Sequence, residues 1–391
     1  MKLTRTVVPA MLATVLAMPP AARAQGTVTD VISFLMTNQS VRTGDFERDR
    51  AAAEAARDAV ANALLINLTS APVASSSSGF LSRLNPELGT VERATESFGS
   101  FFVERALTSG PGRASFGVSA TTASFRQLDG HRLRDGSFVT VANRFRDEPV
   151  PFDTESLTLD VTTSTMTLFG SVGITDRLEI GGAVPFVRLT IDGERLNVYR
   201  GESFVLANGS ATASGVADIA LRAKYTLVML RDGGVAAAAE FRLPTGDEVN
   251  LLGAGTRSLR ILGISSVERG PIALHVNGGF LRGGVSNELA FAGSASFAVS
   301  TRVTLSGELV ARHIDELREV LSVTSPHPTV AGAETLRLIA GDHGRTMVNA
   351  VSGLKWNVNG TMVIAAHIVW PLTRIGLTPR MTPTVAFEYA F

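Results

Sequence analysis

Cysteine is absent from the chain, and charged side chains are scarce. Without cysteine, neither a disulfide framework nor a thiolate metal site can form. Charged residues are 18% of the total, and 36 basic side chains balance 36 acidic ones. A formal net charge of +0 argues against a nucleic-acid-binding protein, whose surface needs an excess of basic residues. We therefore expect no nucleic-acid partner.

After its first residues the chain also lacks any apolar run of roughly 20 residues, the length that a membrane-spanning helix needs. Yet 45% of its 391 residues are hydrophobic and the mean hydropathy is +0.20, which is apolar for a protein of this size. A transmembrane β-barrel explains both facts, because its lipid-facing residues alternate with polar ones and never form a continuous run. A soluble β-sandwich or propeller is the alternative, and it would normally carry more surface charge.

The start of the chain has the features of a secretory signal peptide. A basic beginning (Lys2, Arg5) precedes an apolar run over residues 7–18 and a small-residue pattern at 22–24. We expect cleavage after Ala24, so that residues 1–24 are removed and the protein leaves the cytoplasm. A membrane anchor is the alternative, but the apolar run is short for one.

Residues 25–110 differ in composition from the rest of the chain. Residues 43–68 are rich in Ala, Glu and Arg, with acidic residues early and Thr43 as a candidate N-cap, which predicts a helix. Val60 and Leu64 share one apolar face of that helix. We expect this helical segment to plug a barrel lumen or to lie in the periplasm, and a coiled-coil partner helix is the alternative.

Residues 111–391 have the pattern of strands separated by turns. In the stretch NELAFAGSASFAVST, which begins at Asn287, large apolar residues such as Leu289, Phe291 and Phe297 alternate with alanine and serine. Period-two alternation is typical of strands with two differently solvated faces. We therefore expect an all-β fold, a transmembrane antiparallel up-and-down β-barrel.

The breaks between strands are short at one end and mostly long at the other, as in bacterial barrels with short periplasmic turns and longer outer loops. Short breaks lie at 174–177, 231–234, 268–271, 299–302 and 357–360, and long ones at 128–154, 196–213, 243–256 and 315–343. The predicted strands begin near residues 113, 155, 177, 214, 235, 256, 271, 287, 302, 344, 361 and 380. About 12 strands satisfy the even number of single-chain bacterial barrels. If SFGSFFVERAL (97–107) and one more segment join the wall, the number becomes about 14.

The last strand, TVAFEYAF, places four apolar side chains in one row: Val385, Phe387, Tyr389 and Phe391. We expect this row to face outer-membrane lipid, with its last rings at the periplasmic aromatic girdle and Glu388 pointing into the lumen. A strand that ends on a phenylalanine resembles the signal by which the barrel-assembly machinery recognises its substrates. Outer-membrane lipid and that machinery are therefore the expected partners.

The alternation directs a set of ionisable side chains into the lumen of the predicted barrel. They are Asp218, Arg222, Lys224, Glu240, Arg242, Glu308, Arg312, Lys355, His367 and Glu388. Both signs occur on neighbouring strands, so we expect cross-strand ion pairs. Two roles stay open from the sequence: paired charges that rigidify the wall, or a polar constriction that selects solutes.

Patterns of catalytic or metal-binding residues do not stand out. The six histidines show no metal-ligand spacing such as H-E-x-x-H, and no serine–histidine pair is distinguished by its setting. We expect no catalytic, cofactor-binding or metal-binding residues, no cofactor and no enzymatic activity. An outer-membrane lipid-modifying hydrolase is the alternative.

Four stretches carry a family resemblance: GVADIALRAKYTL (215–227), FRLPTGDE (241–248), GITDRLEIGGAVPF (173–186) and WPL (370–372). They resemble the outer-membrane barrel family labelled "MetA-pathway of phenol degradation", whose members are regarded as transporters, over most of residues 112–391. The resemblance implies passage of small hydrophobic or aromatic molecules and supplies no catalytic residues. The chain is less similar to the long-chain fatty-acid transporter barrels, because Asn85-Pro86 is followed by Glu87 in place of their alanine.

These features predict an outer-membrane channel or transporter of a Gram-negative-type cell. We expect passive, diffusion-driven passage of small-molecule solutes, with the N-terminal helix as a partial plug and no energy source in the chain. A closed structural barrel is a further alternative. The sequence leaves open the solute, the position of the helix, the oligomeric state and whether the lumen is open.

Overall fold

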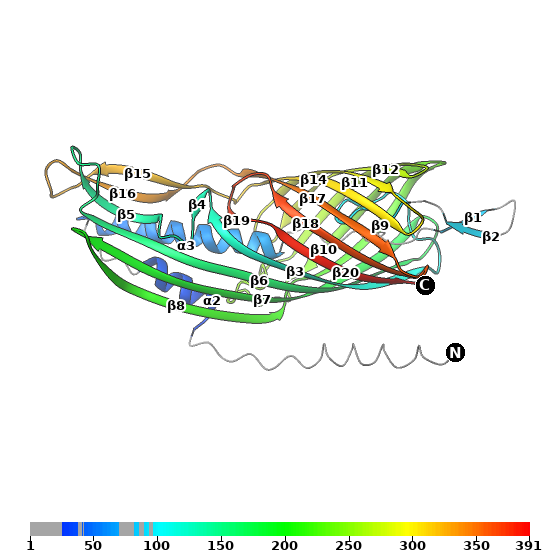
Figure 1. The fold of residues 1–391 in the computed structure, drawn as a ribbon, viewed down its shortest axis with the longest axis horizontal. Coiled ribbons are helices and arrows are strands. Elements are labelled where there is room, and N and C mark those ends of the chain that lie inside the picture. The colour runs from blue at the N-terminus through cyan, green and yellow to red at the C-terminus, as the bar shows by residue number, and fades with distance from the viewer. Residues whose placement is uncertain (1–25, 38–40, 42, 70–81, 86–89, 94–96) are drawn as a thin grey trace.

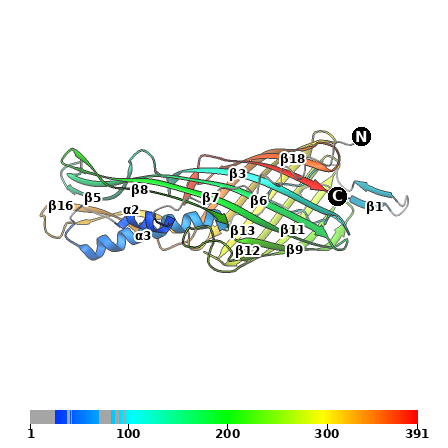
Figure 2. The same ribbon diagram turned by 90° about the horizontal axis from the view of Figure 1, so that it is seen from below.

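The computed structural model describes residues 26–37, 41, 43–69, 82–85, 90–93 and 97–391 (Figure 1). The predicted signal peptide, residues 1–24, lies outside them. The described chain forms a long β-barrel with two helices toward one end and the C-terminus at the other, as two perpendicular views show (Figures 1 and 2). Among these residues, no helix is long and apolar enough to cross a membrane.

The wall is a ring of twelve antiparallel strands in the described part of the chain. In ring order they are β3 (Ala114–Leu128), β6 (Asp153–Gly173), β7 (Leu178–Tyr199), β9 (Ile219–Leu230), β10 (Gly233–Leu243), β11 (Ser258–Arg269), β12 (Ile272–Gly283), β13 (Glu288–Ala298), β14 (Val303–Ile314), β17 (Arg345–Asn357), β18 (Met362–Pro371) and β20 (Thr382–Ala390). Pairing of β20 with β3, in which Phe387 lies opposite Val118, closes the ring. The predicted up-and-down barrel of about 12 strands is confirmed.

The long loops at one end are largely folded into further strands. These are β4 (His131–Arg132), β5 (Phe138–Phe145), β8 (Glu202–Val216), β15 (Val320–Pro326), β16 (Ala333–Ala340) and β19 (Leu377–Pro379). Four of them extend β6 and β7 into a tall curved sheet with the order β15-β16-β5-β6-β7-β8, while β4 and β19 pair with β3. We call this the long-loop end and the opposite one the short-turn end. A separate hairpin of β1 (Ser82–Asn85) and β2 (Thr90–Arg93) lies beyond the short-turn end (Figure 1).

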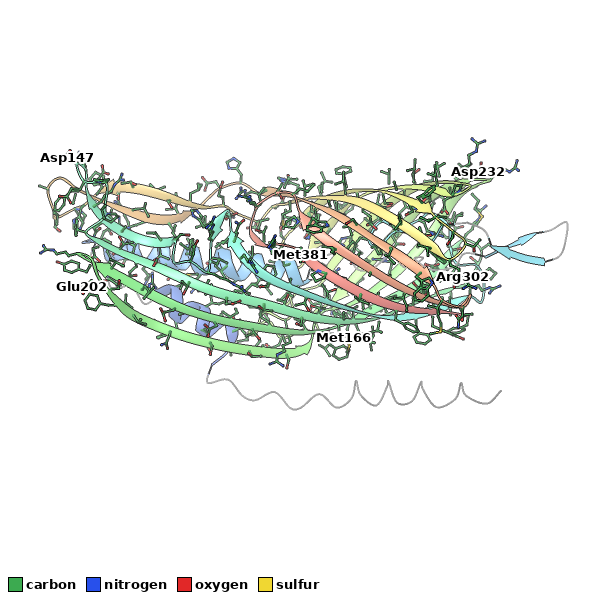
Figure 3. The ribbon with its side chains drawn as sticks, in the orientation of Figure 1. Asp147, Met166, Glu202, Asp232, Arg302 and Met381 are labelled. Atoms are coloured by element: carbon green, nitrogen blue, oxygen red, sulfur yellow. The ribbon has the colours of Figure 1, made fainter. Side chains whose placement is uncertain are left out.

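The outer face of the barrel is apolar between two charged ends. On β13, Leu289, Phe291 and Phe297 are about half exposed, whereas the serines between them are buried. Charged residues of the short turns, such as Asp232 and Arg302, lie at one end, and Asp147 and Glu202 lie at the other (Figure 3). An apolar band between polar rims is the surface that a bilayer requires of a barrel.

Both helices lie at the long-loop end: α2 (Val28–Thr37) against β7 and β8, and α3 (Phe46–Thr69) against β15, β16 and β19. The sequence predicted a helix over 43–68, and α3 covers most of that range. Its apolar side chains, among them Val60 and Leu64, join one core with inward-facing residues of the tall strands, such as Leu159 and Ile191. Among the described residues, the apolar clusters at the short-turn end are small, such as the one of Ala106 with Ala236 and Ile264, so the long-loop end offers the larger apolar partner surface.

Helix α2 begins with a reciprocal cap. The N–H of Asp30 donates to the Thr27 hydroxyl at 3.1 Å, and the N–H of Thr27 donates to the Asp30 carboxylate at 3.0 Å. The hydrogen bond from the Thr27 backbone, followed by that with its side chain, lowers the pKa of Asp30 below its usual value. The carboxylate therefore stays charged at the positive end of the helix dipole.

A buried ion pair holds the other end of α2 to the sheet. The Arg195 Nε lies 2.8 Å from the Glu155 Oε2, and both side chains are fully buried. Arg195 also donates to the backbone oxygen of Leu35 at 2.6 Å, and Glu155 accepts the N–H of Val41 at 2.9 Å. This pair fixes the chain where it leaves α2.

Gly173, the last residue of β6, lies against the chain that enters the wall at β3. A Cβ built on Gly173 would lie 1.9 Å from the backbone oxygen of Gly110, and the N–H of Gly112 donates to the Gly173 oxygen at 2.8 Å. We expect Gly173→Ala to lower the heat stability of the folded barrel by about 1–3 kcal/mol, because backbone must move to admit the methyl group. The midpoint of the heat-induced gel-mobility shift measures this.

The control for that substitution is Gly307→Ala on β14, since a Cβ there meets nothing within 4 Å. It should leave the midpoint unchanged. Equal midpoints for both variants would contradict the close approach at Gly173.

Candidate functional site

Residues 97–109, which we call the lumen segment, run without regular secondary structure through the barrel interior at the short-turn end. Most of their side chains are buried: Ser97, Phe98, Ser100, Phe101, Val103, Glu104, Arg105, Ala106 and Thr108. The alternative of about 14 strands, with 97–107 in the wall, is therefore wrong. Unlike a strand, the segment has its backbone groups satisfied by wall side chains, as buried backbone requires.

Glu308 on β14 holds the middle of the lumen segment. Its carboxylate accepts three consecutive backbone N–H groups, from Phe101 through a short hydrogen bond, from Phe102 at 3.0 Å and from Val103 at 3.2 Å. Opposite in sign, Lys355 on β17 donates to the backbone oxygen of Ser100 at 2.8 Å. Hydrogen bonds to charged groups are stronger than neutral ones, so Glu308 and Lys355 hold the segment firmly to the wall. We call these two side chains the latch.

Glu104 is the only carboxylate that the described part of the lumen segment contributes. Its carboxylate forms a short ion pair with the Arg222 guanidinium and lies 3.7 Å from the Lys224 Nζ. Lys224 also donates to the backbone oxygens of Arg105, at 3.3 Å, and Leu107, at 3.1 Å. Two cations of β9 therefore bind the segment through one side chain and two carbonyl groups.

Ion pairs continue from Arg222 around the wall and form what we call the charge belt. Its members are the cations Arg222, Lys224, Arg242, Arg260 and Arg312 and the carboxylates Glu179, Glu240 and Glu288. Glu240 pairs with Arg222 at 2.5 Å, with Arg242 at 3.0 Å and with Arg260 at 3.7 Å. Glu288 pairs with Arg312 at 2.6 Å and with Arg260 at 3.7 Å, and Glu179 pairs with Lys224 at 3.4 Å. All these side chains are almost fully buried. Desolvated charges are tolerated only with such partners.

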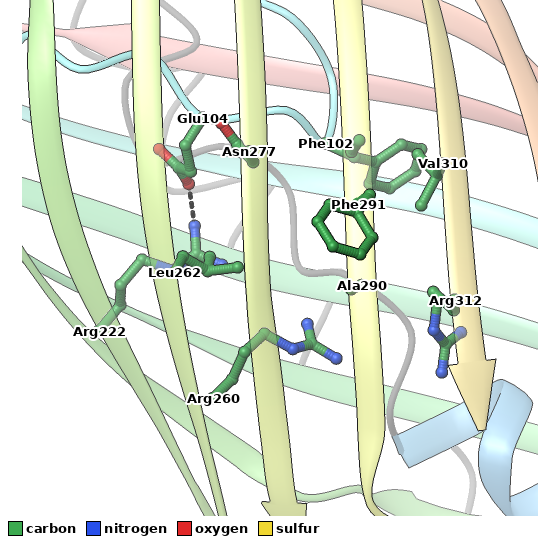
Figure 4. A pocket seen from close by; sticks show the side chains of 11 residues that line it. Phe102, Glu104, Arg222, Arg260, Leu262, Asn277, Ala290, Phe291, Val310 and Arg312 are labelled. Atoms are coloured by element: carbon green, nitrogen blue, oxygen red, sulfur yellow. Dashed lines mark hydrogen bonds and ion pairs between the residues drawn. The ribbon is translucent and has the colours of Figure 1, made fainter. Parts of the chain in front are cut away.

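A cavity of about 50 Å³ lies between the lumen segment and the belt (Figure 4). Its lining includes Phe102 and Glu104 from the segment and the guanidinium groups of Arg222, Arg260 and Arg312 from the wall. At roughly 10–15 Å³ for each water, this space holds a few water molecules and no larger solute.

The sequence-predicted lumen residues are all placed by the structure. Arg222, Lys224, Glu240, Arg242 and Arg312 come together in the belt, and Glu308 and Lys355 form the latch. His367 stacks against Phe101, with ring centroids 4.4 Å apart, and Asp218 accepts backbone N–H groups of the 243–256 loop at 3.1 and 2.8 Å. Glu388 is buried on β20.

Sequence reasoning missed four members of this site: Glu104, Glu179, Arg260 and Glu288. Arg260 and Glu288 follow the same alternation that revealed their neighbours, with Leu259 and Leu289 facing outward beside them. The wall positions could therefore have been found. Glu104 could not, because its segment has no partner strand to fix which side it faces.

In the part of the chain that the structure describes, no group of three or more histidine and carboxylate side chains is placed to hold a metal ion. The histidines stand apart, with His275 bonded to the Ser266 hydroxyl at 2.9 Å and His313 to Thr346 at 3.0 Å.

Comparisons with known proteins find similar barrels among solved structures. An outer membrane channel from Pseudomonas putida F1 is 12% identical, with a TM-score of 0.45 over 72% of this chain and 96% of that one. The translocator domain of the autotransporter NalP from Neisseria meningitidis is 10% identical, with a TM-score of 0.33 over 72% and 89%. OprB from Pseudomonas putida is 7% identical, with a TM-score of 0.28 over 72% and 93%.

No protein-family model matches the chain, and no curated protein matches it either. The resemblance to the phenol-degradation barrel family therefore stays a prediction.

Proposed function

We propose that this protein is an outer-membrane channel for small solutes, closed here by the lumen segment. The observation that carries the proposal is a polar interior occupied by a segment that contacts the wall through hydrogen bonds and ion pairs. Eight strands already make a barrel that side chains alone can fill, so twelve leave room for more. A segment held by non-covalent contacts can be displaced, and its displacement would open that room.

The apolar outer band supports placement in a membrane that accepts β-barrels, the outer membrane of a Gram-negative-type cell. In this placement the short turns and Phe391 face the periplasm, and the helices and tall sheet stand outside the cell. Passage would be passive and limited by the size of the solute. The charge belt would select among solutes, as rings of charged side chains do in pores. Small hydrophobic or aromatic solutes, which the family resemblance implies, are part of this proposal.

Reconstitution of the full chain into planar lipid bilayers tests the proposal. We expect low conductance in the native protein and clearly larger conductance when the latch is broken. A heat-modifiable band in the outer-membrane fraction should accompany this. A protein that stays electrically silent with the latch broken would be a closed structural barrel, and one that fractionates with the soluble periplasm would refute the placement.

We also propose that the C-terminal strand is read by the barrel-assembly machinery. The ring of Phe391 is 59% exposed on the outer face and lies 6.4 Å from the ring of Phe116, while its backbone pairs with Ala114 at 2.9 and 3.0 Å. Phe391→Ala keeps these backbone bonds, so it should fold in detergent as the native chain does but reach the outer membrane in clearly lower amount. Normal membrane levels of the variant would refute a role of the ring.

A further inference from the structure

We propose that Glu104 occupies the place of a solute carboxylate, so that the channel binds and passes small anions that carry a carboxylate on an apolar body. This inference rests on the proposed function and names its solute class. On this view the lumen segment closes the channel by presenting to the wall the groups that the solute would otherwise present.

The geometry around Glu104 is that of a carboxylate-binding site. Arg222 and Lys224 contact the two carboxylate oxygens from one strand, β9, and Arg222, Lys224 and Glu104 are almost fully buried. A guanidinium and an ammonium together offer directed donors and positive charge to an anion. Since Glu104 belongs to the segment, its withdrawal would leave both cations on the wall.

The charge on the wall side of the site is positive. In the belt as described, the five cations Arg222, Lys224, Arg242, Arg260 and Arg312 face the three carboxylates Glu179, Glu240 and Glu288. The difference, five minus three, is two positive charges, and Glu104 offsets one of them. This excess is local to the belt, because the lumen also holds Asp218, Glu308, Glu388 and Lys355, and it favours an anion over a cation at this site.

The surroundings of Glu104 favour an anion with an apolar part. Phe102 lies two residues before Glu104 in the segment, and both line the cavity together with Leu262 and Val310 of the wall (Figure 4). The segment thus presents a ring and a carboxylate to the same space. A small aromatic carboxylate would present the same pair of groups.

Binding of benzoate to the refolded full chain in detergent, followed by calorimetry, tests the inference. Glu104→Gln keeps the shape of the side chain and removes its charge, so this variant should bind benzoate at least tenfold more tightly than the native chain, which is about 1.4 kcal/mol. Adding Arg222→Gln should reverse the gain. Benzamide, the neutral analogue, should bind neither protein measurably.

Two outcomes of the binding measurement would overturn the inference: equal binding of benzoate and benzamide, or a gain in Glu104→Gln that survives the loss of Arg222. The unchanged heat-modifiable band shows that each variant is folded. A second measurement is the reversal potential of the latch variant Glu308→Ala in a KCl gradient, where we expect preference for chloride. A cation-selective current would refute the anion site and leave the channel proposal standing, whereas an absence of current would refute the channel and leave the binding result to decide the site.

Discussion

Replacing Glu308 with alanine should raise the conductance of the reconstituted protein by tenfold or more. The substitution removes three charge-assisted hydrogen bonds to the lumen segment, from Phe101, Phe102 and Val103. Each such bond stabilises its state by about 1.5–3 kcal/mol, and about 1.4 kcal/mol already shifts an equilibrium tenfold. Because the wall strands keep their pairing, the substitution mainly lowers the stability of the closed state.

Asp218→Ala is the matched control for the latch variant. Asp218 is also a buried carboxylate that accepts backbone N–H groups, but these belong to Gly246 and Ala254 of a loop outside the lumen segment. Its loss should lower stability without raising conductance. Equal currents from the two variants would mean that any weakened barrel leaks and that Glu308 is no latch.

Replacing Glu155 with alanine should loosen α2 from the tall sheet. The substitution leaves the Arg195 guanidinium buried without this carboxylate and removes the acceptor of the Val41 N–H. Breaking a buried pair from one side costs about 3–5 kcal/mol. Hydrogen exchange of the described residues 26–37 should therefore become faster by two orders of magnitude or more, at about 1.4 kcal/mol for each factor of ten.

The control for Glu155 is Glu334→Ala on β16. Glu334 also pairs with arginine, at 3.3 Å to Arg144 and 3.0 Å to Arg146, but both of these cations are about half exposed. Exposed pairs contribute about 0–1 kcal/mol, so exchange in α2 should hardly change. Fast exchange in both variants would show that the helix is held by the sheet as a whole and not by the buried pair.

The wall could be predicted from the sequence because its two environments differ sharply. Residues alternate along each strand between the outer face, as Phe291 does, and the interior, as Arg312 does. This period of two recurs in all twelve strands of the wall. The positions of the belt follow from the same rule, with Arg260 and Glu288 as further examples.

The positions of α3 and of the lumen segment could not be predicted in the same way. The face of α3 that carries Val60 and Leu64 was recognisable as apolar, but local periodicity does not say which apolar surface it meets. The chain near Phe101 and Glu104 alternates enough to look like a strand, because wall side chains such as Glu308 and Arg222 bury it from both sides. Its place depends on contacts between residues about 70 to 250 positions apart, which no short pattern contains.

In the proposed placement, the unequal height of the wall affects how solutes would reach the channel. Strand β7 has 22 residues and β12 has 12, so the tall side rises about 33 Å further along the strand direction, at about 3.3 Å for each residue. In the proposed placement this side, with the helices on its inner face, would cover one side of the channel opening. Solutes would therefore enter mainly over the shorter strands β10–β14, where the channel opening lies close to the lipid surface.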